Sequence, residues 1–176
     1  MYLLDTNICI YIIKKKPIEV IKKLKTKSKK DIYISSITVA ELEYGVAKSI
    51  YPEKNRISLI EFLSIFNILN FDDNDAVEFG TIKANLTKKG KIIGPMDLLL
   101  SGQAKSKKLI LVTNNVKEFE RVEGIKIENW VWYKNATSYS KAYPQISEYL
   151  NAGDIGAGKT KETAVVCQLL YIKWNR

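Results

Sequence analysis

The sequence predicts an α/β fold in which a mainly parallel sheet is flanked by helices and followed by a C-terminal extension. Short runs with apolar residues on both faces occur far apart in the chain, as buried parallel strands do. Helical patterns separate these runs, and an alternation of strands and helices is typical of a parallel sheet. Of the 176 residues 46% are hydrophobic, which is enough to form a core without disulfides.

The strands are predicted where β-branched or bulky apolar residues dominate. The clearest runs lie at 2–4, 32–34 and 109–112, and weaker runs at 68–71 and 125–127 are expected to add further strands. Helical periodicity predicts helices at 7–13, 18–25, 39–47, 56–66, 75–88 and 96–106.

A domain boundary is expected near Val131. Strand and helix signals are dense up to this residue, whereas 132–143 is polar and aromatic and the last helical pattern covers 163–174. We therefore predict a main domain of residues 1–131 and an extension, 132–176, of unknown role.

The extension contains a formal match to the P-loop pattern at 153–160 (GDIGAGKT). A P-loop needs a buried strand before it, a helix after it and a sizeable parallel sheet around it. Residues 145–152 make a poor strand and too little chain remains, so no nucleotide binding is expected there. A dimer contact, a fused remnant and a disordered extension remain open alternatives.

The charge of the chain favours a polyanionic partner. The net charge is +9, and lysines cluster at 14–16, 22–30, 88–91 and 105–108. Nucleic acid is the partner that such clusters favour, although a solvated lysine-rich surface is the simpler alternative. The chain has no histidine, which excludes Ser-His and Cys-His catalysis and most zinc sites.

The expected compartment is the cytoplasm. Cys9 and Cys167 are too few and too far apart for a disulfide framework, which favours a reducing environment. No run approaches the roughly 18 apolar residues of a membrane span, and the N-terminus lacks the features of a signal peptide. We therefore expect no membrane association.

Three carboxylates are predicted to meet at the carboxyl edge of the sheet, where open parallel sheets bind ligands. Asp5 ends the first strand, Glu41 is expected in the first turn of the helix after the second strand, and Asp97 in the first turn of the helix opened by Gly94 and Pro95. Clustered carboxylates without histidine suit Mg²⁺ or Mn²⁺, because a divalent cation relieves their repulsion. Together with the basic surface, they predict phosphodiester hydrolysis.

Each acid also has a purely structural interpretation. Asp5 could cap the first helix, Glu41 follows Thr38 at capping-box spacing, and Asp97 could complement a helix dipole. These alternatives weaken together, because all three acids fall at the same predicted edge. The acids at 72–75 are better explained as a strand end and a helix cap.

Several motifs follow one another in a recognisable order: 3–7 (LLDTN), 34–45 (ISSITVAELEYG), 93–99 (IGPMDLL), 111–119 (LVTNNVKEF) and 128–130 (ENW). In this order and spacing they resemble the PIN-domain family, and in particular the VapC-type toxins of toxin–antitoxin systems. The resemblance extends from Tyr2 to about Val131, and the extension departs from it.

The resemblance implies a three-layer PIN-like fold and an endoribonuclease that depends on Mg²⁺ or Mn²⁺. It makes Asp5, Glu41 and Asp97 the catalytic, metal-binding acids. The residues expected to support them are Thr6, Asn7, Thr113 and Asn115. Many relatives carry a fourth acid where this chain has Asn115, so the number of metal ions stays open.

The resemblance also implies partners. They are an RNA substrate, with tRNA and specifically initiator tRNA as the hypothesis, a VapB-type antitoxin, and a second copy of the chain in a homodimer. Two alternatives remain. One is a non-catalytic RNA-binding or regulatory protein with a PIN fold, and the other is a PIN nuclease for RNA maturation that has no antitoxin.

Overall fold

The computed structural model describes residues 1–131, of which Met1 to Trp130 form one unit. The predicted extension and its P-loop-like segment lie outside the described residues, as does Cys167. Cys9 is buried with a free thiol. No helix within residues 1–131 is long and apolar enough to cross a bilayer.

The core of the unit is a five-stranded parallel sheet with the strand order β3-β2-β1-β4-β5. All five predicted strands are present, within two residues of the expected ends. They are β1 (Tyr2–Leu4), β2 (Ile32–Ser35), β3 (Asn67–Leu69), β4 (Ile110–Val112) and β5 (Lys126–Glu128).

Helices connect the strands, and a short 3₁₀ turn, Lys29–Asp31, precedes β2. In chain order the helices are α1 (Thr6–Lys14), α2 (Ile18–Lys25), α3 (Ser36–Ala47), α4 (Pro52–Leu63), α5 (Asp73–Lys88), α6 (Pro95–Ser106) and α7 (Val116–Phe119).

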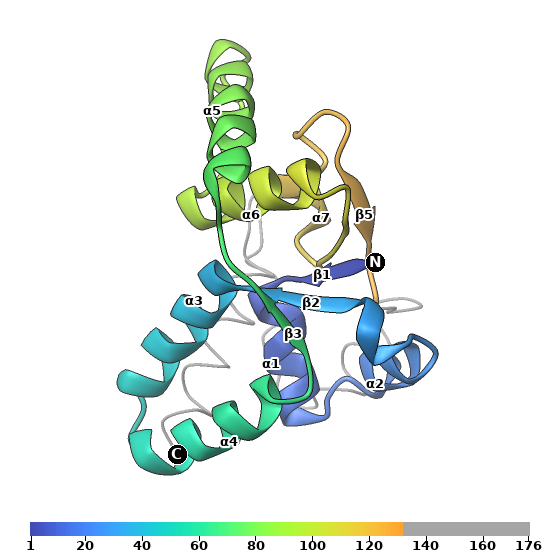
Figure 1. Cartoon of the computed structure of the whole chain (residues 1–176), viewed down its shortest axis with the longest axis vertical. Helices are drawn as coiled ribbons and strands as arrows, with labels where there is room; N and C mark the ends of the chain where they lie inside the picture. Colours follow the sequence, from blue (N-terminus) through green and yellow to red (C-terminus); the bar gives the residue numbers. More distant parts are fainter. Residues whose placement is uncertain (132–176) are drawn as a thin grey trace, which may run out of the picture. The chain divides into compact units, whose positions relative to one another are not determined.

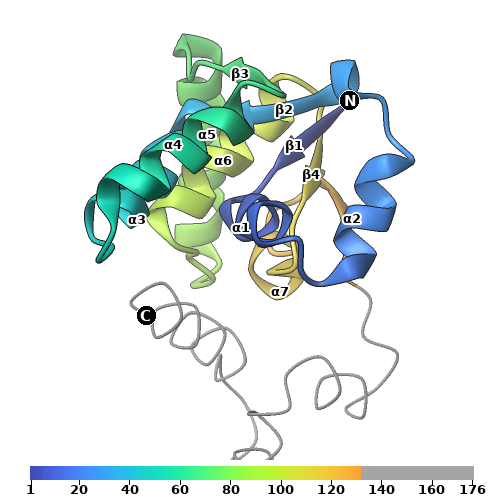
Figure 2. The same ribbon diagram turned by 90° about the horizontal axis from the view of Figure 1, so that it is seen from below.

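The sheet is doubly wound. The chain builds outward from β1 to β3, then returns to place β4 and β5 on the other side of β1. Helices α1 to α4 lie on one face of the sheet, and α5 and α6 on the other (Figures 1 and 2). The winding direction therefore reverses between β1 and β4, and ligands bind beyond the carboxyl ends of the strands at such a point.

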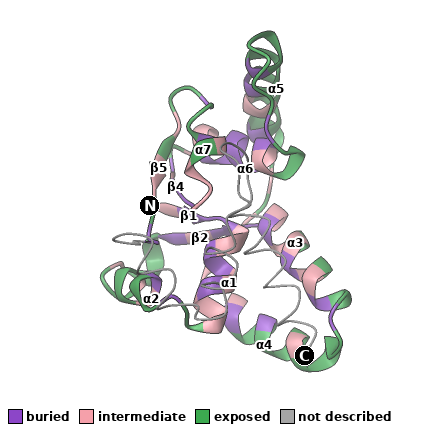
Figure 3. Ribbon diagram, turned by 180° about the vertical axis from the view of Figure 1, so that it is seen from behind, coloured by how far each residue is buried: buried purple, intermediate pink, exposed green. Residues whose placement is uncertain are grey.

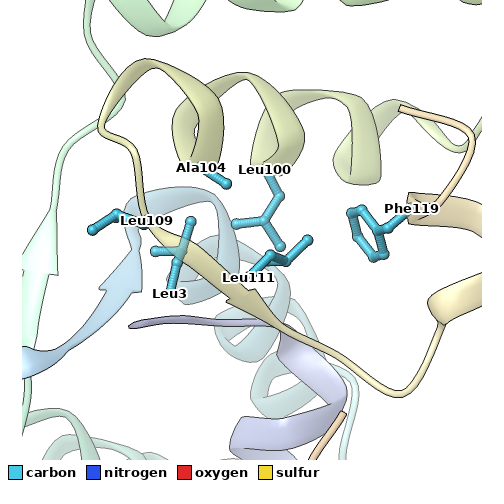
Figure 4. Packing of buried hydrophobic residues seen from close by; sticks show 6 residues of the cluster. All are labelled: Leu3, Leu100, Ala104, Leu109, Leu111 and Phe119. Atoms are coloured by element: carbon cyan, nitrogen blue, oxygen red, sulfur yellow. The ribbon is translucent and has the colours of Figure 1, made fainter. Parts of the chain in front are cut away.

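One side of the sheet packs against α6 through a single apolar cluster. Leu3 on β1 and Leu111 on β4 contact Leu100 and Ala104 on α6, and Phe119 at the end of α7 closes the cluster (Figure 4). Burial follows this pattern: buried residues line the strands and the inner sides of the helices, whereas much of α5 is exposed (Figure 3). The packing holds the central residues of β1 and β4 at fixed positions.

Two helices start three or four residues earlier than predicted. α3 begins at Ser36, directly after β2, because the Ser35 hydroxyl accepts a hydrogen bond from the Ile37 amide at 3.0 Å and caps the helix. The expectation that Glu41 lies in the first helical turn was therefore wrong, since it lies in the second. α4 begins at Pro52 rather than at 56, and proline at the first helical position is a common start signal.

The start of α5 confirms the structural interpretation of the acids at 72–75. Asp72 and Asp75 form a capping box, in which each side chain accepts a hydrogen bond from the other residue's backbone amide at 3.1 Å. Asp75 is fully buried and also accepts from Gln103 at 3.1 Å. This buried carboxylate joins α5 to α6 and lies outside the predicted metal site.

Gly102 is required where α5 and α6 approach most closely. A Cβ at this position would lie 2.8 Å from the Asp75 carbonyl oxygen and 2.9 Å from the Phe79 amide nitrogen. Backbone atoms cannot retreat as a flexible side chain can. The substitution must therefore push the two helices apart.

We expect Gly102→Ala to lower the free energy of unfolding by about 1–3 kcal/mol. The matched control is Gly80→Ala on α5, where a Cβ meets no atom within 4 Å, and alanine there should add up to about 1 kcal/mol of stability. Urea denaturation of both variants measures the difference. Equal stability of the two would contradict the close approach.

Candidate active site

Asp5 occupies the reversal point of the sheet. It follows β1 directly, its amide donates to the Val112 carbonyl at the end of β4 at 3.0 Å, and it is the residue before α1. Its side chain is only 6% exposed and makes no capping hydrogen bond to α1. The interpretation of Asp5 as a helix cap therefore does not explain its side chain.

Thr113 holds the Asp5 carboxylate from the neighbouring strand. Its buried hydroxyl donates to Asp5 Oδ2 at 2.7 Å and accepts from the Asn115 amide at 2.9 Å. A hydroxyl that both donates and accepts has a defined rotamer. The Asp5 carboxylate is thereby fixed in orientation by the segment that follows β4.

Glu41 reaches the same edge from α3. Its Oε2 accepts a hydrogen bond of 2.5 Å from the Thr6 hydroxyl at the start of α1. The Glu41 side chain thus joins α3 to α1 and does not form a capping box with Thr38. The Thr38 hydroxyl instead donates to the Leu4 carbonyl oxygen at 3.4 Å. The capping interpretation of Glu41 is wrong.

Asp97 lies in the first turn of α6, as predicted, with Gly94 as the N-cap and proline at the first helical position. Its Oδ2 accepts from the Asn115 side-chain amide at 3.4 Å. Asn115 therefore contacts both the Thr113 hydroxyl and the Asp97 carboxylate. It links the residues after β4 to the helix that carries the third acid.

The acids affect one another electrostatically. Burial raises the pKa of Asp5 to about 6, although the Thr113 hydrogen bond lowers it, and the charge of Glu41 adds to the rise. Burial also raises the pKa of Asp97 to about 7. The negative charges of Asp5, Glu41 and Glu118 contribute to that rise, in this order. The four carboxylates thus share one local field.

Glu118 is the site residue that the sequence did not single out. It lies on α7, and its charge acts on Asp97. The spacing could have indicated it. Glu118 is the third residue after Asn115, and side chains three residues apart lie on the same face of a helix. Where Asn115 supplies an amide, Glu118 supplies a fourth negative charge.

Asn7 stands apart from the other predicted supporting residues. Thr6, Thr113 and Asn115 each hydrogen-bond an acid of the site. Among residues 1–131, the Asn7 side chain has no hydrogen-bond partner. Its predicted supporting role stays a prediction.

The donor set suits a hard divalent cation. Its acids are carboxylates: burial, and after it the charges of its acidic neighbours, raises the pKa of Asp97. None of the ion pairs among residues 1–131 involves Asp5, Glu41 or Asp97. In this arrangement no three acidic or cysteine side chains of the described residues surround one point as metal ligands do. The acids thus supply negative charge and oxygen ligands suited to a hard cation without forming a closed set of metal ligands.

We expect Asp97→Asn to stabilise the metal-free protein at pH 8. The folded-state pKa of about 7 lies above the unfolded value near 4, so the fold binds the proton more tightly and its unfolding free energy falls as the pH rises from about 4 to about 7. Asparagine removes this loss. Because Asp97 is only half-buried, we expect a gain of about 1–2 kcal/mol at pH 8 and a smaller one at pH 5.

Urea denaturation at both pH values in EDTA measures this effect. Asp31→Asn, at an exposed acid away from the site, is the control and should show no such pH dependence. A variant that is no more stable than the wild type at pH 8 would contradict the raised pKa of Asp97.

Residues 2–125 match the PIN domain family. Ribonuclease VapC2 of Haemophilus influenzae is 49% identical over 130 residues, which are 74% of this chain and 98% of the relative. The tRNA(fMet)-specific endonuclease VapC of Salmonella typhimurium is 43% identical over 129 residues, which are 73% of this chain and 97% of the relative.

Solved structures of VapBC complexes are also similar to this chain. The DNA-bound VapBC of Salmonella typhimurium matches with a TM-score of 0.70 and 42% identity over 74% of this chain and 98% of the matched chain. VapBC2 of Rickettsia felis, bound to a DNA fragment from the promoter, matches with a TM-score of 0.70 and 43% identity over the same shares. The predicted PIN-like fold is confirmed, and the chain belongs to the PIN-domain family, within its VapC group.

Proposed function

We propose that this chain is a ribonuclease toxin that hydrolyses RNA phosphodiester bonds and is neutralised by a VapB-type antitoxin. The observation that carries the proposal is the group of Asp5, Glu41 and Asp97 at the reversal point of the sheet. The chain has no histidine and a net charge of +9, so carboxylates beside a basic surface are the groups available for phosphodiester chemistry.

The proposed cofactor is Mg²⁺ or Mn²⁺, held by Asp5, Glu41 and Asp97. When bound, such a cation neutralises charge on the scissile phosphate and makes a water molecule more acidic. The mutual repulsion of the carboxylates supports this assignment, because a cation placed among them lowers the energy of their charged forms. Glu118 is close enough to add to that negative field.

The chain's own residues orient the acids. The Thr113 hydroxyl directs one Asp5 oxygen, and the Thr6 hydroxyl directs one Glu41 oxygen. Preformed orientation of this kind avoids reorganisation when the substrate binds.

The proposed substrate is tRNA, with initiator tRNA as the specific hypothesis. Support comes from the tRNA(fMet)-specific relative at 43% identity. Exposed lysines provide phosphate contacts suited to a structured RNA. They include Lys15, Lys16, Lys22, Lys25, Lys29, Lys30, Lys88 and Lys91.

Protein partners are supported by apolar side chains that remain exposed along α3, α4 and the turn between them. Isolated apolar residues are common on surfaces, whereas several on adjacent elements favour an interface. They are Tyr44, Ile50, Tyr51, Ile57 and Ile60. We propose a homodimer and a VapB-type antitoxin as the partners, in the cytoplasm where tRNA is found.

Purified protein should cut total tRNA into discrete fragments with Mg²⁺ or Mn²⁺. EDTA should stop the reaction, and Asp97→Asn should reduce the rate about 100-fold or more. Gel analysis with end-mapping identifies the cut. RNA binding without cleavage, in protein freed of any co-purified antitoxin, would instead favour the non-catalytic alternative, and preference for an unrelated RNA would remove the tRNA hypothesis.

Expression of the chain alone should arrest bacterial growth, because an uninhibited tRNA nuclease stops translation. Co-expression of a neighbouring antitoxin gene should restore growth, and Asp97→Asn should abolish the arrest. Colony counts after induction measure both. Normal growth with an active nuclease would favour RNA maturation without an antitoxin, and arrest by the Asp97→Asn variant would reject the proposed site.

A further inference from the structure

Arg121, in the turn after α7, joins two segments on either side of Asp97. Its guanidinium binds Glu118 with two prongs, Nη1 to Oε2 and Nη2 to Oε1, both at 3.1 Å. Nη1 also donates to the Ile92 carbonyl oxygen at 3.3 Å, in the loop that leads into α6. Arginine suits this contact, because its planar fork holds a carboxylate in one orientation.

The same turn is packed against the start of α6. Val122 belongs to an apolar cluster with Ile93 and Leu98, which flank the first turn of the helix that carries Asp97. Arg121 adds a polar interaction to this contact, because it donates to the Ile92 carbonyl oxygen. The turn after α7 is thus attached to the loop before α6 in two ways. Val122 packs against Ile93, and Arg121 donates a hydrogen bond to the Ile92 carbonyl oxygen.

The residue before the N-terminal end of α7 contacts Asp97 itself. Asn115, the residue before the helix, donates its side-chain amide to Asp97 at 3.4 Å. Glu118 acts on Asp97 through its charge. A four-residue helix has little stability of its own, so the position of Glu118 depends on what holds it.

We propose that Arg121 is a positioning residue that fixes α7 against the start of α6 and so sets the placement of Glu118 relative to Asp97. The inference rests on the proposed nuclease function. In this role Arg121 does not contact the substrate. It acts through Glu118 and the Ile92 carbonyl.

Arg121 also lines a cavity of about 330 Å³ together with Lys89 and Lys105, which suggests a competing role as a phosphate contact. The two roles separate kinetically. Loss of a phosphate contact weakens substrate binding and raises KM, whereas loss of a positioning residue lowers kcat. Lys105 already pairs with Glu78 at 3.4 Å and Lys89 with Glu123 at 3.2 Å, which makes the cavity a weak anion site.

The test compares Arg121→Gln, Arg121→Lys and the control Glu123→Gln in metal-dependent tRNA cleavage. Glutamine at position 121 removes the charged guanidinium, whereas lysine keeps a positive charge but cannot bind the carboxylate with two nitrogens. Glu123→Gln breaks the exposed neighbouring ion pair with Lys89. We expect Arg121→Gln to lower kcat about tenfold with KM changed less than about twofold. Lysine should restore part of the rate, and the control should match the wild type.

Hydrogen exchange of the metal-free proteins is the second readout. Peptides covering residues 90–98 should exchange faster in Arg121→Gln than in the wild type or the control, while the melting temperature stays within a few degrees. Wild-type kcat together with wild-type exchange would overturn the proposal, as would a raised KM with unchanged kcat. If the wild type itself cleaves no RNA, the nuclease function fails, and exchange still decides whether Arg121 holds the loop.

Discussion

The rest of the site depends on the burial of a charged group between two parallel strands. Asp5 is almost fully enclosed at the reversal point of the sheet, where a carboxylate is poorly solvated and its pKa rises to about 6. The hydrogen bond from Thr113 offsets part of this penalty and determines the direction of one oxygen. The strand pairing of β1 with β4, and the apolar cluster beneath them, keep donor and acceptor within reach.

Much of the fold could be predicted from the sequence, because buried parallel strands leave an unbroken apolar signal. Such runs predict interior positions for Leu3, Leu4 and Leu111, and all three residues are buried. The starts of helices were harder. Ser35 ends a strand and caps a helix at once, so the expected turn between the elements does not exist, and Glu41 moves one helical turn along. α7 is too short for periodicity to reveal it.

The site was predictable to the extent that strand ends determine it. Asp5 and Thr113 follow adjacent strands, so topology alone brings them together. Glu118 was missed because its place depends on a four-residue helix and on the Arg121 contacts. Asn115 was expected to support the acids, but the sequence did not indicate which groups it contacts. Its backbone amide donates to the Thr113 hydroxyl, and its side-chain amide donates to the Asp97 carboxylate. A carboxylate side chain at this position could not make the second contact and would add to the repulsion.

The contact between Asp5 and Thr113 spans 108 positions of the chain. A ribosome making this protein releases Asp5 early, but the partner that orients it emerges only after most of the domain has been synthesised. β1 can pair with β2 in the meantime, whereas its other edge stays open until β4 arrives. The fold therefore has high contact order at its centre, and the orientation of Asp5 by Thr113 requires that β4 has been synthesised and paired with β1.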